Sequence, residues 1–195
     1  MSARTANPRV LPLIVERWSP RAFDASALPQ ADLDVIFEAA GLAPSAFNYQ
    51  PWRFLYAHRA DAALFESFLA PLVPFNQMWA KDASVLVYVV SDENMTNNES
   101  SNPNHSHSFD AGGAWANLAL QATALGYHAH GMTGLDFAKA REVLHVPEGF
   151  RIEAAIAIGR QAPAEVLPEG LRDREVPSPR KPVAEIAYAG TFPRG

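Results

Sequence analysis

Apolar residues recur at helical spacing in three stretches of the chain. The stretches run from Pro29 to Gly41, from Asp61 to Leu72 and from Asp136 to Val146. Proline suits the first turn of the first stretch and glycine ends it, so its bounds are well marked. In the second stretch, the spacing predicts an inward face of Leu64, Phe65, Phe68 and Leu69. A shorter helix is expected from about Pro12 to Arg17.

Four runs rich in β-branched and other apolar residues predict strands. They cover Trp52–Ala57, Ala83–Val90, His128–Met132 and Arg151–Gly159. The run at Ala83–Val90, ASVLVYVV, has no polar interruption, which is typical of a central strand covered on both faces. The order of helices and strands predicts an α+β layer structure in which a mixed sheet is sandwiched by helices.

Two neighbouring segments differ sharply in polarity. Ser91–Ser108 is so rich in polar residues that it predicts an exposed and mobile loop, with its role as a lid left open. Its His105 and His107 lack a third ligand in view, so we expect no metal site. Phe109–Gly126 has helical spacing but is apolar nearly all round, which predicts burial in a dimer interface or at the domain centre.

The C-terminal segment 160–195 carries six prolines and little periodicity, which predicts an extended arm and no second domain. The 195 residues suit one domain, or one subunit of an intertwined dimer. With no basic-then-apolar leader and no apolar run of about 18 residues, we expect a soluble, cytoplasmic protein without membrane contact.

The amino-acid composition limits the partners and the redox chemistry that the chain can use. The formal net charge of −5 disfavours nucleic acid as a partner. Because the chain has no cysteine, it has no disulfide, thiolate nucleophile or iron–sulfur ligand, so redox chemistry would require a cofactor. Neither a G-x-G-x-x-G string nor a P-loop is present, so a nicotinamide would be a visiting substrate.

Two polar strings contain candidate binding groups. Ala43–Trp52, APSAFNYQPW, places hydroxyl and amide side chains between two prolines that favour extended backbone at either edge. Glu16–Phe23, ERWSPRAF, places two guanidiniums and a hydroxyl within five positions, a set suited to an anion. Taken singly, the first string also fits an ordinary polar loop, and the second fits a solvated helix end.

The pair of strings resembles the opening of the nitroreductase family, which are FMN-dependent oxidoreductases with a basic R-x-S-x-R string followed by P-S-x-x-N-x-Q-P-W. The resemblance implies an α+β fold with a mixed, mainly antiparallel sheet and an intertwined homodimer. It also implies FMN as the cofactor, bound at the subunit interface, and NADH or NADPH as the electron donor.

The resemblance implies a role for each matching residue. Arg17, with Trp18 and Ser19, would contact the phosphate and ribityl chain, and Arg21 would reach the pyrimidine edge of the flavin. Ser45 and Asn48 would come from the opposite subunit, and Pro44 and Ala46 beside them would also belong to the cofactor site. Asn76 would hydrogen-bond the polar edge of the ring, Thr133 and Gly134 would pass its reactive edge, and Arg180 would bind the phosphate.

Four positions depart from the family pattern. Ala46 replaces a second serine, Thr133 a glutamate and Ser178 a lysine, while Trp79 stands where some members have a flavin-facing lysine. FMN binding is still expected. The changes at Trp79 and Thr133 predict a less charged pocket than in well-known members.

The implied reaction has two half-reactions in one cavity. A dihydronicotinamide reduces the flavin and leaves, and an electron-poor small molecule such as a nitroaromatic or quinone then takes the electrons, which predicts ping-pong kinetics. Arg21 is the candidate for stabilising the reduced flavin, and no protein acid or base is assigned. A specialised reductase or dehydrogenase of a pathway metabolite, a non-catalytic FMN-binding protein and a purely structural dimer remain alternatives.

Overall fold

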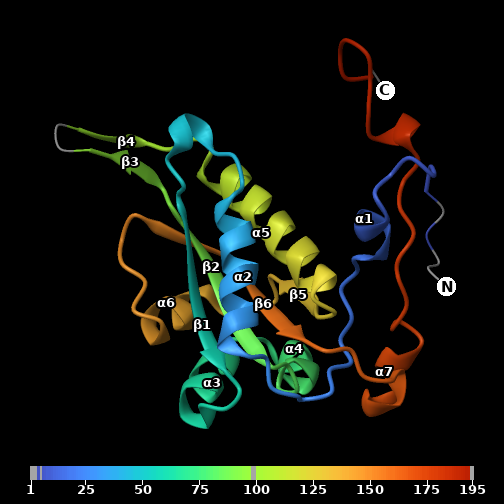
Figure 1. The fold of residues 1–195 in the computed structure, drawn as a ribbon. Helices are drawn as coiled ribbons and strands as arrows, with labels where there is room; N and C mark the ends of the chain where they lie inside the picture. Colours follow the sequence, from blue (N-terminus) through green and yellow to red (C-terminus); the bar gives the residue numbers. More distant parts are fainter. Residues whose placement is uncertain (1–3, 5, 98–99, 194–195) are drawn as a thin grey trace.

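A four-stranded sheet forms the centre of the molecule (Figure 1), seen in a computed structural model that describes residues 4, 6–97 and 100–193. The strands are β1 (Trp52–His58), β2 (Val85–Asp92), β5 (His128–Met132) and β6 (Phe150–Gly159), in the order β1-β2-β6-β5. This confirms the predicted α+β fold with a mainly antiparallel sheet. All three pairings among these strands are antiparallel, so the described sheet has no parallel component.

Helices cover both faces of the sheet. The longer helices α2 (Gln30–Gly41) and α5 (His107–Ala124) pack on one face, where Leu33, Ile36 and Leu118 join the strands in one buried cluster. On the other face lie α3 (Ala62–Leu69), α4 (Pro74–Ala80) and α6 (Phe137–Val143), with Phe65 and Phe68 in a second cluster. The sheet therefore separates two hydrophobic cores.

The region predicted as one helix, Asp61–Leu72, contains only α3, and a second helix, α4, follows it. Pro74 occupies the first turn of α4, where its fixed φ is compatible with a helix. Leu64 was expected to face inward, but its side chain is 43% exposed. The buried stripe of α3 is narrower than the sequence pattern and consists of Phe65, Phe68 and Leu69.

The segment between β2 and α5 is more ordered than expected. Within the predicted loop Ser91–Ser108, the short strands β3 (Asn94–Thr96) and β4 (Ser101–Pro103) pair as a hairpin, while residues 98–99 lie outside the described part. Ser91 and Asn104 are buried, although the segment was predicted to contribute nothing to the interior. Hydrogen bonds satisfy their polar groups, which permits this burial.

Helix α5 buries one face, not its whole circumference. Ala111, Ala114 and Leu118 lie against the sheet, whereas Phe109 is 85% exposed. The expectation of burial at the centre of the domain is therefore wrong for the outer face of this helix. In the described part of the chain, no helix is long and apolar enough to cross a membrane.

The two ends of the chain lie together beside the sheet (Figure 1). The N-terminal helix α1 (Pro12–Glu16) runs beside the segment that follows α7 (Glu169–Arg172), and Arg4 Nε donates to the carbonyl oxygen of Ser178. The side chains of residue 176 and of residues 178–193 are exposed, including those of the short turn η3 (Val183–Glu185). Another short turn, η2 (Ala164–Val166), precedes α7.

Candidate functional site

A cavity of about 670 Å³ lies between the outer part of α5, the strands β5 and β6, and the basic string that follows α1. Its lining includes Arg17 and Ser19 from the basic string, and Thr133 at the end of β5. Gly112 and Ala116 are small residues of α5 that line the cavity. This volume is in the range of small-molecule and cofactor sites, so three of the predicted binding residues share one ligand-sized space.

Arg17 also lines a second cavity, of about 750 Å³, between the two chain ends. Arg4 and Arg180 contribute to the same cavity. Burial lowers the pKa of Arg17, and the positive charges of Arg4 and Arg180 lower it further. The fold thus brings three guanidiniums from distant parts of the sequence together, an arrangement that an anion would stabilise.

A buried carboxylate holds the backbone around Arg21. The N–H groups of Arg21 and Ala22 donate to Glu175 Oε1 over 2.7 and 2.8 Å. Burial lowers the pKa of Arg21, as does Arg174, while Glu175 acts in the opposite direction. Arg21 Nε is buried and, among the described residues, has no hydrogen-bond partner. Such a donor is available for a ligand atom.

Two histidines of β5 pack beneath the basic string, and the sequence reasoning did not assign them. His130 Nδ1 lies 2.8 Å from the carbonyl oxygen of Pro20, so this nitrogen carries the proton and donates. Burial lowers the pKa of His130 to about 4. Trp18 is buried with its ring edge against His128. The alternation of histidine with small residues along β5 was the sequence signal that could have identified these two histidines.

Trp79 lies in the core, contrary to the expectation that it changes the character of the pocket. Its side chain is 1% exposed, and its ring lies 4.6 Å from that of His130. The residue therefore supports the wall beneath the basic string and does not line the cavity described above. A tryptophan can occupy this position because the hydrophobic cluster around it is large enough for the indole.

Asn76 and Gly134 contact one another. Asn76 Nδ2 donates to the carbonyl oxygen of Gly134 over 3.0 Å. A Cβ atom at position 134 would lie 2.7 Å from the same nitrogen, too close for van der Waals contact. Glycine is therefore required for this packing, which sets the backbone beside Thr133 at the cavity wall.

The remaining predicted residues lie apart from this cavity. Pro44, Ser45, Ala46 and Asn48 belong to the loop and short turn η1 (Ala46–Asn48) that follow α2, beyond the end of that helix (Figure 1). None of the four lines the cavity that contains Arg17. Ser45 Oγ accepts from the N–H of Gln50, and Phe47, Asn48 and Gln50 all have a φ of 53°. The structure thus brings together only part of the predicted set.

The comparison with family models gives one assignment. The model described as "Nitroreductase family" matches residues 14–160, three quarters of the chain. The chain belongs to the nitroreductase family. The match spans the basic string, the loop after α2 and the end of β5, so it includes most of the residues from which the resemblance was inferred.

Similar proteins of this family include two solved structures. One, described as an oxidoreductase containing FMN, is 47% identical, covers 99% of this chain and 98% of its own, and superposes with a TM-score of 0.95. A provisionally named nitroreductase from Desulfovibrio desulfuricans, in complex with FMN, is 29% identical, covers 97% and 100%, and has a TM-score of 0.73. An Archaeoglobus fulgidus relative, provisionally named NADH dehydrogenase/NAD(P)H nitroreductase, is 29% identical over 76% of this chain and 83% of its own.

Proposed function

We propose that this nitroreductase-family protein is an FMN-dependent oxidoreductase that transfers electrons from NADH or NADPH to an electron-poor small molecule, such as a nitroaromatic or quinone. The observation that carries the proposal is the group of three guanidiniums, Arg4, Arg17 and Arg180, at a ligand-sized cavity. FMN in two similar structures and the nicotinamide in one relative's name support the choice of cofactor and donor.

The residues present fit FMN. Its phosphate would offset the mutual repulsion of Arg17 and Arg180, which lowers the pKa of Arg17. The buried Nε of Arg21 has no partner among the described residues and could donate to the polar edge of the ring. The glycine at position 134 allows close packing against Asn76, which sets the backbone next to Thr133. These features match one monophosphate and one flat heterocycle.

In this proposal each predicted residue has a defined task. Arg17, Trp18, Ser19 and Arg180 would hold the phosphate and ribityl chain, and Arg21, Asn76, Thr133 and Gly134 would hold the ring. Bound FMN supplies hydride acceptance and donation. Arg21, whose backbone N–H donates to Glu175, would contribute a positive charge that favours an anionic cofactor. Donor and acceptor occupy one cavity in turn, so the kinetics are ping-pong.

The proposal includes a homodimer in which Pro44, Ser45, Ala46 and Asn48 serve the partner's site. Exposed apolar side chains support it: Phe47 is 91% exposed, and Phe109 and Ile186 are also exposed. These side chains lie at the loop after α2, on α5 and on the C-terminal arm respectively, and a second subunit would cover them.

The visible spectrum of the purified protein tests this function. We expect a yellow protein that releases FMN, not FAD, on heating, and that is bleached by NADH or NADPH without oxygen. A panel of acceptors then distinguishes a broad nitro and quinone reductase from an enzyme specific for one metabolite. Bound FMN that neither nicotinamide reduces would indicate a non-catalytic carrier, and a colourless protein that refuses added FMN would contradict the proposal.

A further inference from the structure

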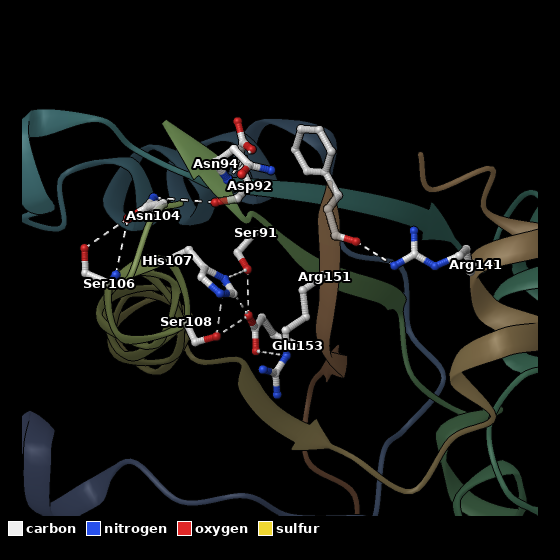
Figure 2. A network of polar contacts seen from close by, with 11 residues as sticks. Ser91, Asp92, Asn94, Asn104, Ser106, His107, Ser108, Arg141, Arg151 and Glu153 are labelled. Atoms are coloured by element: carbon white, nitrogen blue, oxygen red, sulfur yellow. Dashed lines mark hydrogen bonds and ion pairs between the residues drawn. The ribbon is translucent and has the colours of Figure 1, made fainter. Parts of the chain in front are cut away.

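A cluster of polar side chains lies where the cavity meets the start of α5 (Figure 2). It consists of Ser91 at the end of β2, His107 and Ser108 in the first turn of α5, and Glu153 on β6. Ser108 and Glu153 line the cavity. The resemblance to the nitroreductase family assigned none of these residues a role, and the proposed function does not use them.

A β-bulge directs Glu153 into this cluster. Val89 pairs with Ala154 but the next residue, Val90, pairs with Ile152, which leaves Glu153 as the extra residue of β6. Ile152 packs in the core on the opposite face of the sheet, whereas both Glu153 and Ala154 line the cavity. A bulge re-aims a side chain in this way at the cost of one ladder pairing, and bulges are common next to active sites.

The hydrogen bonds of the cluster have a defined direction. Ser108 Oγ donates to Glu153 Oε1 over 2.7 Å, and Ser91 Oγ donates to the same oxygen over 2.6 Å. A serine hydroxyl has one proton, so at the 2.7 Å contact between Ser91 Oγ and His107 Nδ1 the imidazole must be the donor. The proton path therefore runs from His107 through Ser91 to Glu153.

This arrangement does not suit nucleophilic catalysis. In a serine hydrolase the serine and the carboxylate bind opposite nitrogens of the imidazole. Here His107 Nδ1 faces both, at 2.7 Å from Ser91 Oγ and 3.5 Å from Glu153 Oε1. Ser91 is also fully buried, so its hydroxyl is not accessible to a substrate carbonyl.

The charges around the cluster are few. Arg151 Nε lies 3.5 Å from Glu153 Oε2, on the side away from the serines. On the neighbouring elements, Asp92 of β2 accepts from Tyr49 and Asp110 of α5 accepts from the Ala46 N–H. The side chains of His107 and Glu153 are 16% and 17% exposed, so the cluster is shielded, yet water can reach it.

We infer that His107, Ser91 and Glu153 form a proton relay that supplies the acceptor during its reduction. This inference rests on the proposed function. Reduction of a quinone to a hydroquinone consumes one hydride, which is the cofactor's chemistry, and one proton, which the protein provides. His107 passes its Nδ1 proton to Ser91 Oγ while Ser91 passes its own proton to Glu153 Oε1, and His107 takes up a proton from water at Nε2. Glu153 then gives the proton that it received to the acceptor oxygen, so that the net transfer is one proton from water to the acceptor.

The test compares two acceptors. Holoprotein reduced with dithionite is mixed anaerobically with para-benzoquinone, whose reduction needs a proton, or with ferricyanide, which takes electrons alone. We expect Glu153→Gln to slow oxidation by the quinone about 10- to 100-fold and to change oxidation by ferricyanide less than about twofold. The exposed Glu148 provides the matched control, and Glu148→Gln should affect neither reaction.

A second variant and a spectroscopic measurement guard against a folding defect. Ser91→Ala keeps Glu153 but interrupts the path, so it should show the same difference between acceptors. In the protein as purified, ¹⁵N shifts of neutral His107 should place its proton on Nδ1. Equal slowing with both acceptors, no slowing with either, or a proton on Nε2 would each overturn the relay.

The relay and the proposed function can fail separately. Because dithionite supplies the electrons, the acceptor comparison does not depend on NADH or NADPH. Holoprotein that contains FMN and reacts with quinone unchanged by Glu153→Gln would overturn the relay alone. A protein without flavin would overturn the proposed function, and the relay with it.

Discussion

The two strings that suggest cofactor binding, ERWSPRAF and APSAFNYQPW, differ in how the fold holds them. The basic string is locked in place: Glu175 binds the backbone at Arg21 and Ala22, and His130 binds Pro20. The loop after α2 stands at the surface, with Phe47 91% exposed and three residues at positive φ. A non-glycine residue in that region is strained. In the proposed homodimer, the basic string would supply one half of a binding site, and the exposed loop would supply the other half to the partner subunit.

The largest loss of FMN affinity is expected for a change in the basic string. Arg17→Ala should weaken FMN binding by about 1.5–3 kcal/mol, because it removes a charge-assisted contact to the phosphate. That corresponds to roughly 10- to 150-fold in Kd. Fluorescence titration of the apoprotein measures it. Arg59→Ala, which removes a guanidinium that instead donates to the carbonyl of Lys81, is the control. Equal affinity in both variants would show that Arg17 does not bind the phosphate.

A loss of FMN affinity of the same size tests whether Arg17 and Asn48 of one binding site come from different chains. Arg17→Ala and Asn48→Ala should each weaken binding alone, but in a mixed dimer both lesions fall in one site and leave the other intact. We expect strong FMN binding at about one site per mixed dimer, measured by titration of the separated heterodimer. Two equally weakened sites would mean that Arg17 and Asn48 serve the same flavin from a single chain.

His130, which holds the basic string at Pro20, should make folding stability sensitive to acid. The pKa of His130 is about 4 in the folded protein and near 6.5 in the unfolded chain, chiefly because of burial. Between these values the unfolded state binds the additional proton, so folding stability falls as the pH drops from 6.5 towards 4. With allowance for partial exposure, we expect a loss of about 2 kcal/mol by urea unfolding. His130→Gln should lose less over this range, whereas replacement of the exposed His105 by glutamine should not alter the loss.

The smallest loss of stability is expected from removing the hydrogen bond between Asp110 and the loop after α2. Ala46 N–H donates to Asp110 Oδ2 over 3.1 Å. Asp110→Ala should cost about 1 kcal/mol and speed hydrogen exchange at the amide of Ala46. The amide of Ala22, bound to Glu175, should exchange at an unchanged rate, which separates local from global opening. Asp173→Ala, at an exposed site, should change neither amide.

Elements with strong local patterns were predictable from the sequence. The strand His128–Met132 was placed at its observed bounds, and the helix ending at Gly41 agrees with α2. Their signals are short in range: alternation, β-branched residues, a proline at one end and a glycine at the other. The family assignment was predictable for a similar reason, because both strings are contiguous in the chain.

Errors arose where distant residues decide the outcome. Leu64 fits the helical stripe of its neighbours, yet its side chain is 43% exposed. Ser91 and Asn104 belong to a segment whose composition predicts a solvated loop. Yet Ser91 donates to Glu153 of β6, and Asn104 accepts from Ser106, the residue before α5. The single extra residue of β6 that directs Glu153 to the cavity follows from its register with β2, and a strand's own sequence does not contain its register.

The sequence by itself determined the elements with strong local patterns, the absence of cysteine chemistry and the strings that identify the family, because each is a property of consecutive residues. Only the tertiary structure decided that Arg4, Arg17 and Arg180 meet, that Glu175 supports Arg21, and that Trp79 is core and not cavity wall. These contacts join residues up to 176 positions apart, between Arg4 and Arg180. Packing of apolar residues around the sheet brings these distant residues together, and the local sequence pattern does not specify such contacts.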